Sequence, residues 1–371
     1  MAEIMVGMSG GVDSSVAAAL LQRQGHRVVG VTLKLWGGES DSGCCSVSDV
    51  DDARRVARTL GIEHHVFNFG DDFDRHVVDP YVADHAAGRT PNPCVECNRH
   101  IKFDKLLRRA EALGFGYVAT GHHARIVTEP AEPAEPVEPA GTAGPGVEHS
   151  GDELRRFVAR GADAAKDQSY VLYMLDQYRL ARTVLPVGDL TKDEVRAIAA
   201  ELELDTAAKP DSQDVCFIHS QGGRRQFLGE RIPLAPADLI DTDGRQLGRV
   251  SSVELVTIGQ RRGLDLGGDE QRRYVVDIDR SAGLVTVGHR ADLMTGEQPV
   301  GDVVWADTPV TGPLDFQCSA HGTVRAGSLT ATGDGTPVIE WRDSQPKVAE
   351  GQSIAFYRGD TVVGGALARS G

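Results

Sequence analysis

The chain has 371 residues, of which 40% are hydrophobic and 25% charged, a composition typical of a globular protein with two or three domains. It has no run of 18 apolar residues and no basic-then-apolar leader, so we expect a cytoplasmic protein without a membrane segment. The net charge of −15 argues against general affinity for nucleic acid, so any RNA site must be a local basic patch. Six cysteines are too few and too scattered for a secreted disulfide framework.

The most informative motif is the loop at residues 9–15, Ser-Gly-Gly-Val-Asp-Ser-Ser. It follows an apolar run at 4–8 that predicts a buried strand, and it leads into a predicted helix at 14–24. Such a turn presents backbone N–H groups at the positive end of a helix dipole, a geometry that binds phosphate. The loop lacks the lysine and the spacing of a Walker A motif. It resembles the pyrophosphatase loop (PP-loop) of enzymes that split ATP between its α and β phosphates.

Predicted strands and helices alternate over the first 120 residues. The strands are expected at 4–8, 28–33, 63–67 and 117–120, and the helices at 14–24, 47–60, 71–85 and 98–113. This alternation predicts an α/β domain with a parallel sheet covered on both faces. Ligands of such sheets bind beyond the carboxyl ends of the strands, which is where the loop at 9–15 falls.

The rest of the chain changes character twice. Residues 129–152 repeat Glu-Pro-Ala and carry no lysine or arginine, which predicts a disordered or extended insertion between strands at 124–127 and 154–160. Helical pattern returns at 167–178 and 191–203, the second opening on a Thr191–Glu194 capping box.

After about residue 230, short β-branched runs separated by glycine and proline predict small β domains or a barrel. These runs are 255–258, 274–278, 284–287, 300–305, 338–341 and 353–357. We therefore predict a catalytic domain at 1–212, a central small domain at 213–288 and a C-terminal domain at 289–371.

Three cysteines stand in contexts that suggest chemistry. Cys94 and Cys97 form a Cys-x-x-Cys pair before the predicted helix at 98–113, which places Cys97 at a helix start that favours a thiolate. The pair alone fits a redox couple, half of a metal site or coincidence, and without a second such pair a closed zinc site is not expected. Cys216 follows a polar loop, and on its own it predicts only a small buried residue.

Five segments occur together in one order and at compatible spacing: 9–15, 91–98 with 101–103, 120–122, 166–170 and 212–218. In these segments the chain resembles the tRNA-specific 2-thiouridylases, bacterial enzymes that place sulfur on the wobble uridine of certain tRNAs. The resemblance spans nearly the whole length apart from the proline-rich insertion. It implies an N-terminal PP-loop domain of the adenine nucleotide α-hydrolase type, a small central β-rich domain and a C-terminal β-barrel.

The resemblance implies a reaction in which the uracil 2-oxygen attacks the α phosphate of ATP, and sulfur then displaces AMP. It assigns ATP binding to Gly7, Met8, Ser9, Gly10, Gly11, Val12, Asp13, Ser14, Leu33 and Gly121. Asp13 is also suited to help hold the Mg²⁺ that a triphosphate needs. By resemblance Cys216 carries sulfur as a persulfide and Cys97 is the nucleophile, which closes a Cys97–Cys216 disulfide or assists attack on the activated base.

The resemblance also implies contacts with tRNA. It points to Asn92, Pro93 and Cys94 around the target base, to His122, Lys166, Asp167 and Gln168 near the anticodon arm, and to Gln352 in the C-terminal domain. Thr323 and Val324 stand where relatives have an Arg-Tyr pair, which weakens the C-terminal contact. The expected partners are tRNA and a sulfur-relay protein or cysteine desulfurase.

One departure opens a second chemistry. Cys94 stands where many relatives have aspartate, so Cys94, Cys97 and Cys216 together match the three ligands of a [4Fe–4S] cluster with one open iron. Persulfide relay and cluster use the same residues, and the relay is our preferred interpretation. The alternatives outside wobble thiolation are a thiolase for another tRNA position, another PP-loop ligase, and a tRNA-binding or sulfur-carrier protein without catalysis.

Overall fold

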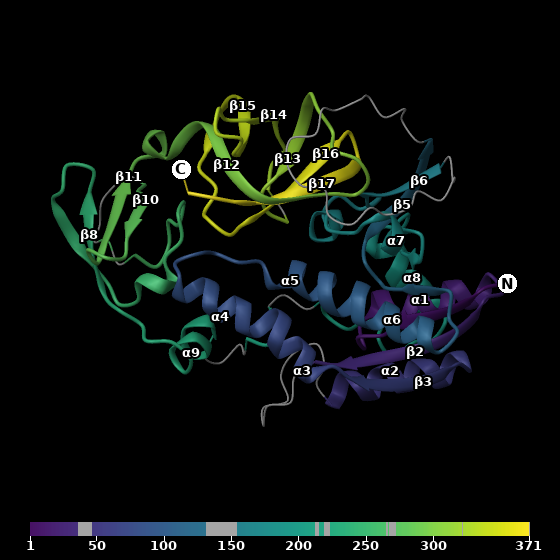
Figure 1. Ribbon diagram of the computed structural model, residues 1–371. Helices are drawn as coiled ribbons and strands as arrows, with labels where there is room; N and C mark the ends of the chain where they lie inside the picture. The colour runs from purple at the N-terminus through teal and green to yellow at the C-terminus, as the bar shows by residue number, and fades with distance from the viewer. Residues whose placement is uncertain are drawn as a thin grey trace.

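The computed structural model describes residues 1–35, 47–130, 154–211, 215–218, 223–264, 266, 272–320 and 322–370. An N-terminal α/β part, coloured purple to teal in Figure 1, lies below a yellow-green β-barrel. A smaller sheet that contains β8 (Ala237–Asp241), β10 (Tyr274–Asp279) and β11 (Leu284–Gly288) lies to the left of the barrel.

The N-terminal sheet has five strands in the order β3-β2-β1-β4-β7, and all its pairings are parallel. The strands are β1 (Glu3–Gly7), β2 (Arg27–Lys34), β3 (Glu63–Asn68), β4 (Tyr117–Ala119) and β7 (Thr183–Val184). The interiors of β1 and β2 are buried throughout and, apart from Thr32, are apolar, because helices cover both faces of a parallel sheet. The predicted parallel sheet is confirmed.

Alternate residues of β1 point into two separate cores. Ile4 and Val6 pack with α1 (Val12–Arg23), α2 (Val47–Leu60) and α8 (Lys192–Glu201) on one face. Met5 packs on the other face with the two long helical segments at 70–86 and 93–112. The period-two alternation of a strand therefore divides the core into two layers.

Both long helical segments contain a π-helical stretch. The first consists of α3 (Gly70–Phe73), η1 (Asp74–Val78) and α4 (Asp79–Ala86), and the second of α5 (Pro93–Glu96), η2 (Cys97–Lys105) and α6 (Leu106–Ala112). The second begins at Pro93, five residues before the predicted start. Its N-cap Asn92 accepts a hydrogen bond from the Cys94 amide, and proline is favoured at the first helical position.

The helix predicted at 167–178 is wrong. A single 3-10 turn, η3 (Ser169–Leu172), is followed by the short α7 (Gln177–Leu180), whose N-cap Asp176 interrupts the helical pattern. The capping box of α8 is confirmed, because Thr191 and Glu194 bond to each other's backbone amides.

The C-terminal part is a closed six-stranded barrel in which β12 pairs with both β15 and β17. Its strands are β12 (Met294–Trp305), β13 (Pro313–Gln317), β14 (Arg325–Ala331), β15 (Pro337–Pro346), β16 (Ser353–Arg358) and β17 (Thr361–Ala368). The central sheet, of order β10-β11-β8-β9, consists of β8 (Ala237–Asp241), β9 (Gln246–Val250), β10 (Tyr274–Asp279) and β11 (Leu284–Gly288). The remaining elements are α9 (Gly223–Gly229), η4 (Val253–Leu255) and η5 (Arg290–Leu293).

The predicted barrel is confirmed, whereas the strand predicted at 255–258 is wrong. Residues 253–255 form the 3-10 turn η4, and Val253 and Val256 are buried against the central sheet without joining it.

A hairpin of the N-terminal part extends the barrel sheet. Strand β17 pairs with β6 (Leu154–Arg160), which pairs antiparallel with β5 (Ala124–Pro130). The two strands predicted around the insertion are thus confirmed, although β5 continues through Glu129 and Pro130, the first residues of the predicted insertion. Residues 131–153 lie outside the described residues. In the part of the chain that the structure describes, no helix is long and apolar enough to span a membrane.

Candidate nucleotide and thiol site

The loop at 9–15 leaves β1 at the point where the sheet order reverses, with β2 on one side and β4 on the other. Crevices at such points bind ligands in open parallel sheets. Gly11 is the N-cap of α1 and no side chain caps the helix, so its first amides are available to an anion. Gly10 has a φ of +73°, and a Cβ there would collide with the backbone of Asp49. Only glycine fits this close approach.

A second loop closes against the first. Gly121 follows β4, and a Cβ at Gly121 would lie 2.5 Å from the amide nitrogen of Ser14. The Ser14 hydroxyl donates to the Gly11 carbonyl at 3.2 Å and accepts from the Ser9 amide at 3.2 Å. Leu33, near the carboxyl end of β2, is buried beside this edge of the sheet. The structure therefore brings Ser14 and Gly121 together at the predicted ATP site.

Asp13, in the first turn of α1, is held by two cationic or polar side chains. Lys192 Nζ lies 2.8 Å from each carboxylate oxygen of Asp13, and His123 Nε2 lies 3.0 Å from Oδ1. Burial alone would raise the pKa of Asp13, but the hydrogen bonds from His123 and Lys192 outweigh burial and lower it. Oδ1 of Asp13 thus accepts two hydrogen bonds, whereas Oδ2 accepts one and keeps a lone pair for a further ligand.

Asp211 shares the same lysine. Its Oδ1 lies 2.8 Å from Lys192 Nζ and 3.1 Å from Arg196 Nη2, and its Oδ2 lies 2.8 Å from Lys166 Nζ. Burial would raise the pKa of Asp211, but hydrogen bonds from Lys166 and Lys192 lower it to about 2. One buried lysine, only 8% exposed, therefore joins a carboxylate of the loop to a second carboxylate.

Another lysine fixes the loop from outside. Lys209 Nζ donates to the Gly10 carbonyl at 3.0 Å and pairs with Asp49 and Asp52 of α2. The sequence analysis missed the residues of this charged network: His123, Lys192, Lys209 and Asp211. The capping box indicates that Lys192 begins a helix. The ion pair between Lys192 and Asp13, however, joins residues 179 positions apart, so no local pattern indicates it.

The two thiols of the Cys-x-x-Cys pair occupy different environments. Cys94 lies in the first turn of α5 and is exposed, whereas Cys97 follows that turn and is buried, at 7% exposure. The expectation that Cys97 begins the helix is wrong, because Asn92 and Pro93 start it one turn earlier. The helix N-terminus therefore acts on Cys94 more directly than on Cys97.

Cys97 and Cys216 pack against the same apolar cluster. The cluster contains Leu33 and Leu35 at the carboxyl end of β2, together with Phe217. Phe217 in turn forms edge-on contacts with Phe73 and Tyr81. Both predicted sulfur residues therefore belong to the core on the face of the sheet that Met5 lines.

No disulfide joins the cysteines of the described residues. Among those residues, no three His, Cys, Asp or Glu side chains form a group that could hold a metal ion. Cys44 and Cys45, and Ser212, Gln213 and Asp214 of the Cys216 motif, lie outside the described residues.

Burial in the barrel raises the pKa of the Cys318 thiol to about 11.

The predicted target-base residues adjoin the barrel. Asn92 caps α5, and Pro93 behind it is buried. The Thr90 amide donates to the Glu350 carbonyl at 2.7 Å. The turn before Gln352 therefore lies against the segment that immediately precedes Asn92. The structure places these two parts of the predicted tRNA surface side by side.

The residues expected near the anticodon arm form a second group. The Gln168 side chain accepts from the His123 amide at 2.9 Å, and Asp167 accepts from the Ser169 amide and hydroxyl. His122 is buried, which lowers its pKa well below the ordinary value. Lys166 remains partly exposed beside Asp211. The carboxylate of Asp167 is therefore turned into the protein, whereas the Lys166 side chain is partly accessible to solvent.

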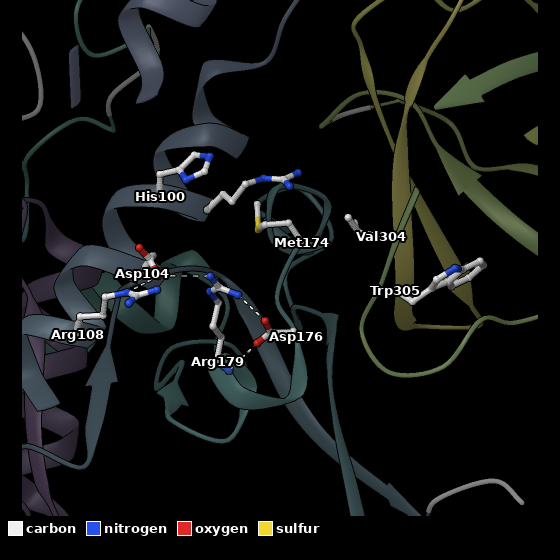
Figure 2. Close-up of a pocket in the computed structure, with 9 residues that line it drawn as sticks. His100, Asp104, Arg108, Met174, Asp176, Arg179, Val304 and Trp305 are labelled. Carbon is white, nitrogen blue, oxygen red and sulfur yellow. Dashed lines mark hydrogen bonds and ion pairs between the residues drawn. The ribbon is translucent and has the colours of Figure 1, made fainter. Parts of the chain in front are cut away.

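A cavity of about 490 Å³ lies between the helix of Cys97 and the barrel. Figure 2 shows Asp104, Arg108, Arg179 and Asp176 linked by ion pairs, and the ring of Trp305 directed away from them. Because the two aspartates pair with two of its three arginines, the cavity offers little net charge to a ligand. It contains none of the predicted site residues, and we place the site at the phosphate loop.

Three family models match consecutive parts of the chain. A model described as the HUP domain of a tRNA methyl transferase matches residues 2–220. A PRC-barrel domain of the same description matches residues 225–289, and an aminomethyltransferase β-barrel domain matches residues 299–368.

Curated relatives match over almost the full length. A protein of Roseiflexus sp. is 44% identical over 380 residues, which is 98% of this chain and 98% of the relative. Proteins of Chloroflexus aurantiacus and Desulforamulus reducens are 42% and 40% identical over 375 residues, 98% of this chain and 98% and 95% of the relatives. All three are named tRNA-specific 2-thiouridylase MnmA. Through these full-length matches, the chain belongs to the tRNA-specific 2-thiouridylase family.

Proposed function

We propose that this chain is a tRNA-thiolating transferase that uses ATP to replace the 2-oxygen of the wobble uridine with sulfur. The observation that carries the proposal is one parallel sheet that bears both the phosphate loop, closed against Gly121, and an apolar core that includes Cys97 and packs against Cys216. Relatives of 40–44% identity over 98% of the chain are named for this activity.

The matched domain models carry methyltransferase descriptions, so methyl transfer is the competing assignment. Methyl transfer from a sulfonium donor requires neither a phosphate loop nor two thiols beside it. The loop and the thiols instead fit a reaction that activates an oxygen as a leaving group and then supplies sulfur. Thiolation accounts for both features.

In the proposed first step, the uracil 2-oxygen attacks the α phosphate of ATP. A bond forms between this oxygen and the α phosphorus, and pyrophosphate leaves with the electron pair of the broken P–O bond. The uncapped N-terminus of α1 would stabilise the phosphates. The Asp13 carboxylate, held in place by Lys192 and His123, would help to hold the Mg²⁺ of the nucleotide, which would neutralise part of the triphosphate charge.

In the second step, sulfur displaces AMP. The terminal sulfur of a Cys216 persulfide forms a bond to C2 of the base, and the C2–O bond breaks toward AMP. The Cys97 thiolate then attacks Sγ of Cys216, which forms a Cys97–Cys216 disulfide and leaves the electron pair on the thiolated base. A protein persulfide would load Cys216, and a dithiol reductant would reopen the disulfide. The cysteines must approach to Cα separations of about 4.4–6.8 Å for this step.

The direct test is thiolation of an unmodified tRNA transcript with a wobble uridine. The transcript is incubated with ATP, Mg²⁺ and a cysteine-desulfurase sulfur source, then resolved on a mercury-containing gel that retards thiolated RNA. We expect a retarded band with the wild type and none with Cys216→Ser. A wild type that cleaves ATP without retarding the RNA would assign the chain to another class of PP-loop ligase.

The Cys94 thiol separates the relay from the cluster. We expect Cys94→Ser to keep thiolation within about threefold of the wild type, because its amide, rather than its thiol, receives the helix cap. The measurement is the mercury-gel assay, together with visible absorption after anaerobic incubation with iron and sulfide. Loss of thiolation together with loss of a cluster spectrum that the wild type shows would replace the relay by cluster chemistry.

A further inference from the structure

The phosphate loop has no cationic side chain of its own. Residues 9–15 contain one charged group, the carboxylate of Asp13. A triphosphate bound there, and the pyrophosphate that leaves it, carry several negative charges that backbone amides alone would have to balance. A positive side chain from another element would stabilise both.

Lys192 is placed to supply this charge. It is the first residue of α8, with its own amide donating to Asp163 at 3.0 Å, and its ammonium reaches the Asp13 carboxylate beside the loop. The side chain is 10% exposed, so solvent screening is weak. A buried ammonium next to anion-binding amides is strongly attracted to phosphate.

Lys192 is also the cation that can leave its partners at the lowest cost. Without it, Asp211 keeps Lys166 and Arg196, and Asp13 keeps His123. Neither carboxylate would be buried and unpaired, which is the expensive outcome of breaking an ion pair. Lys209, by contrast, holds the backbone of the loop itself through the Gly10 carbonyl.

We propose that Lys192 binds the β and γ phosphates of ATP and the departing pyrophosphate, with Asp13 and Asp211 holding its ammonium in place when the nucleotide is absent. This assignment rests on the proposed function, since it takes ATP as the nucleotide. It gives the reaction a phosphate-binding lysine from α8, outside the PP-loop motif.

The test compares ligands with and without the β phosphate. Competition against a fluorescent ATP analogue gives the affinities of ATP, pyrophosphate and AMP for each full-length variant. In Lys192→Met we expect binding of ATP and pyrophosphate to weaken roughly 10- to 100-fold, as for loss of a charged hydrogen bond, and that of AMP to change less than about threefold. Lys192→Arg should recover part of the loss.

Asp211→Asn removes the same bridge from its other end and is the matched comparison. If Lys192 only braces the fold, Asp211→Asn and Lys192→Met will weaken ATP and AMP equally, and the proposal is wrong. If Lys192 binds phosphate, the ratio of ATP affinity to AMP affinity will fall in Lys192→Met and will stay near the wild-type ratio in Asp211→Asn, which keeps the ammonium. Lys105→Met, at a partly exposed lysine paired with Asp72, is the neutral control. Should Lys192→Met fail to fold, Lys192→Gln carries the same comparison.

The proposed function and this inference fail in different ways. A wild type that binds neither ATP nor pyrophosphate contradicts the proposed function. A wild type that binds ATP and thiolates tRNA, with a Lys192→Met variant of unchanged ATP affinity, contradicts only the role of Lys192.

Discussion

Replacement of Cys97 by serine is expected to abolish tRNA thiolation, lowering the rate at least about a thousandfold, as loss of a nucleophile does. The exchange of one sulfur for oxygen preserves the shape of a side chain that is 7% exposed. Serine cannot close a disulfide with Cys216, so sulfur bonded to the base through Cys216 would not be released. ATP affinity should stay within about twofold, because the thiol belongs to the apolar cluster and not to the phosphate loop. The mercury gel and equilibrium binding measure the two quantities.

Cys318→Ser is the control, since it makes the same atomic exchange at a buried thiol of the barrel. We expect this variant to thiolate tRNA at the wild-type rate when it is assayed below its melting temperature. Thiolation by Cys97→Ser at a tenth of the wild-type rate or more would rule out the disulfide step.

Gly121→Ala should produce the largest loss of nucleotide binding. The added methyl group would lie 2.5 Å from the Ser14 nitrogen and 2.6 Å from the Asp13 carbonyl carbon, both in the backbone of the phosphate loop. No side-chain rotation relieves that overlap, so the loop must move away from β4. We expect ATP affinity to fall at least about tenfold and the free energy of unfolding to fall by about 1–3 kcal/mol, as for overpacked sites. Isothermal titration and thermal melting test the two effects.

Gly116→Ala gives a control in the same part of the chain. A Cβ at Gly116 meets nothing within 4 Å, so ATP affinity and melting temperature should remain those of the wild type. Wild-type ATP affinity in Gly121→Ala would show that the phosphates do not bind against this face of the loop.

Local pattern was sufficient to predict most of the α/β half. The helix at 47–60 and the strand at 154–160 have the predicted bounds. In the helix, apolar residues recur with the helical period. The predicted helix bounds were wrong where an N-capping side chain started or divided a helix at a position that the hydrophobic periodicity did not indicate. Asn92 and Pro93 start a helix one turn early, and Asp176 divides another, since a capping side chain competes with the helix for backbone hydrogen bonds.

The charged network at the loop was not predictable from the sequence. The Asp13–Lys192 pair spans 179 residues and the Lys209–Gly10 bond spans 199, so no local pattern relates them. The same holds for Cys97 and Cys216, whose common cluster depends on how η2 packs on the sheet. The family resemblance indicated which residues belong to the site. Only the structure shows which of their side chains contact the same neighbouring residue.

The hairpin of β5 and β6 has one end beside the candidate site and the other end far from it. At one end, Ala124 pairs with Arg160 beside the segments of His123 and Asp167, and at the other Pro130 pairs with Leu154. Six residues of strand set these ends about 20 Å apart. The chain therefore leaves and rejoins the hairpin at neighbouring points remote from the phosphate loop.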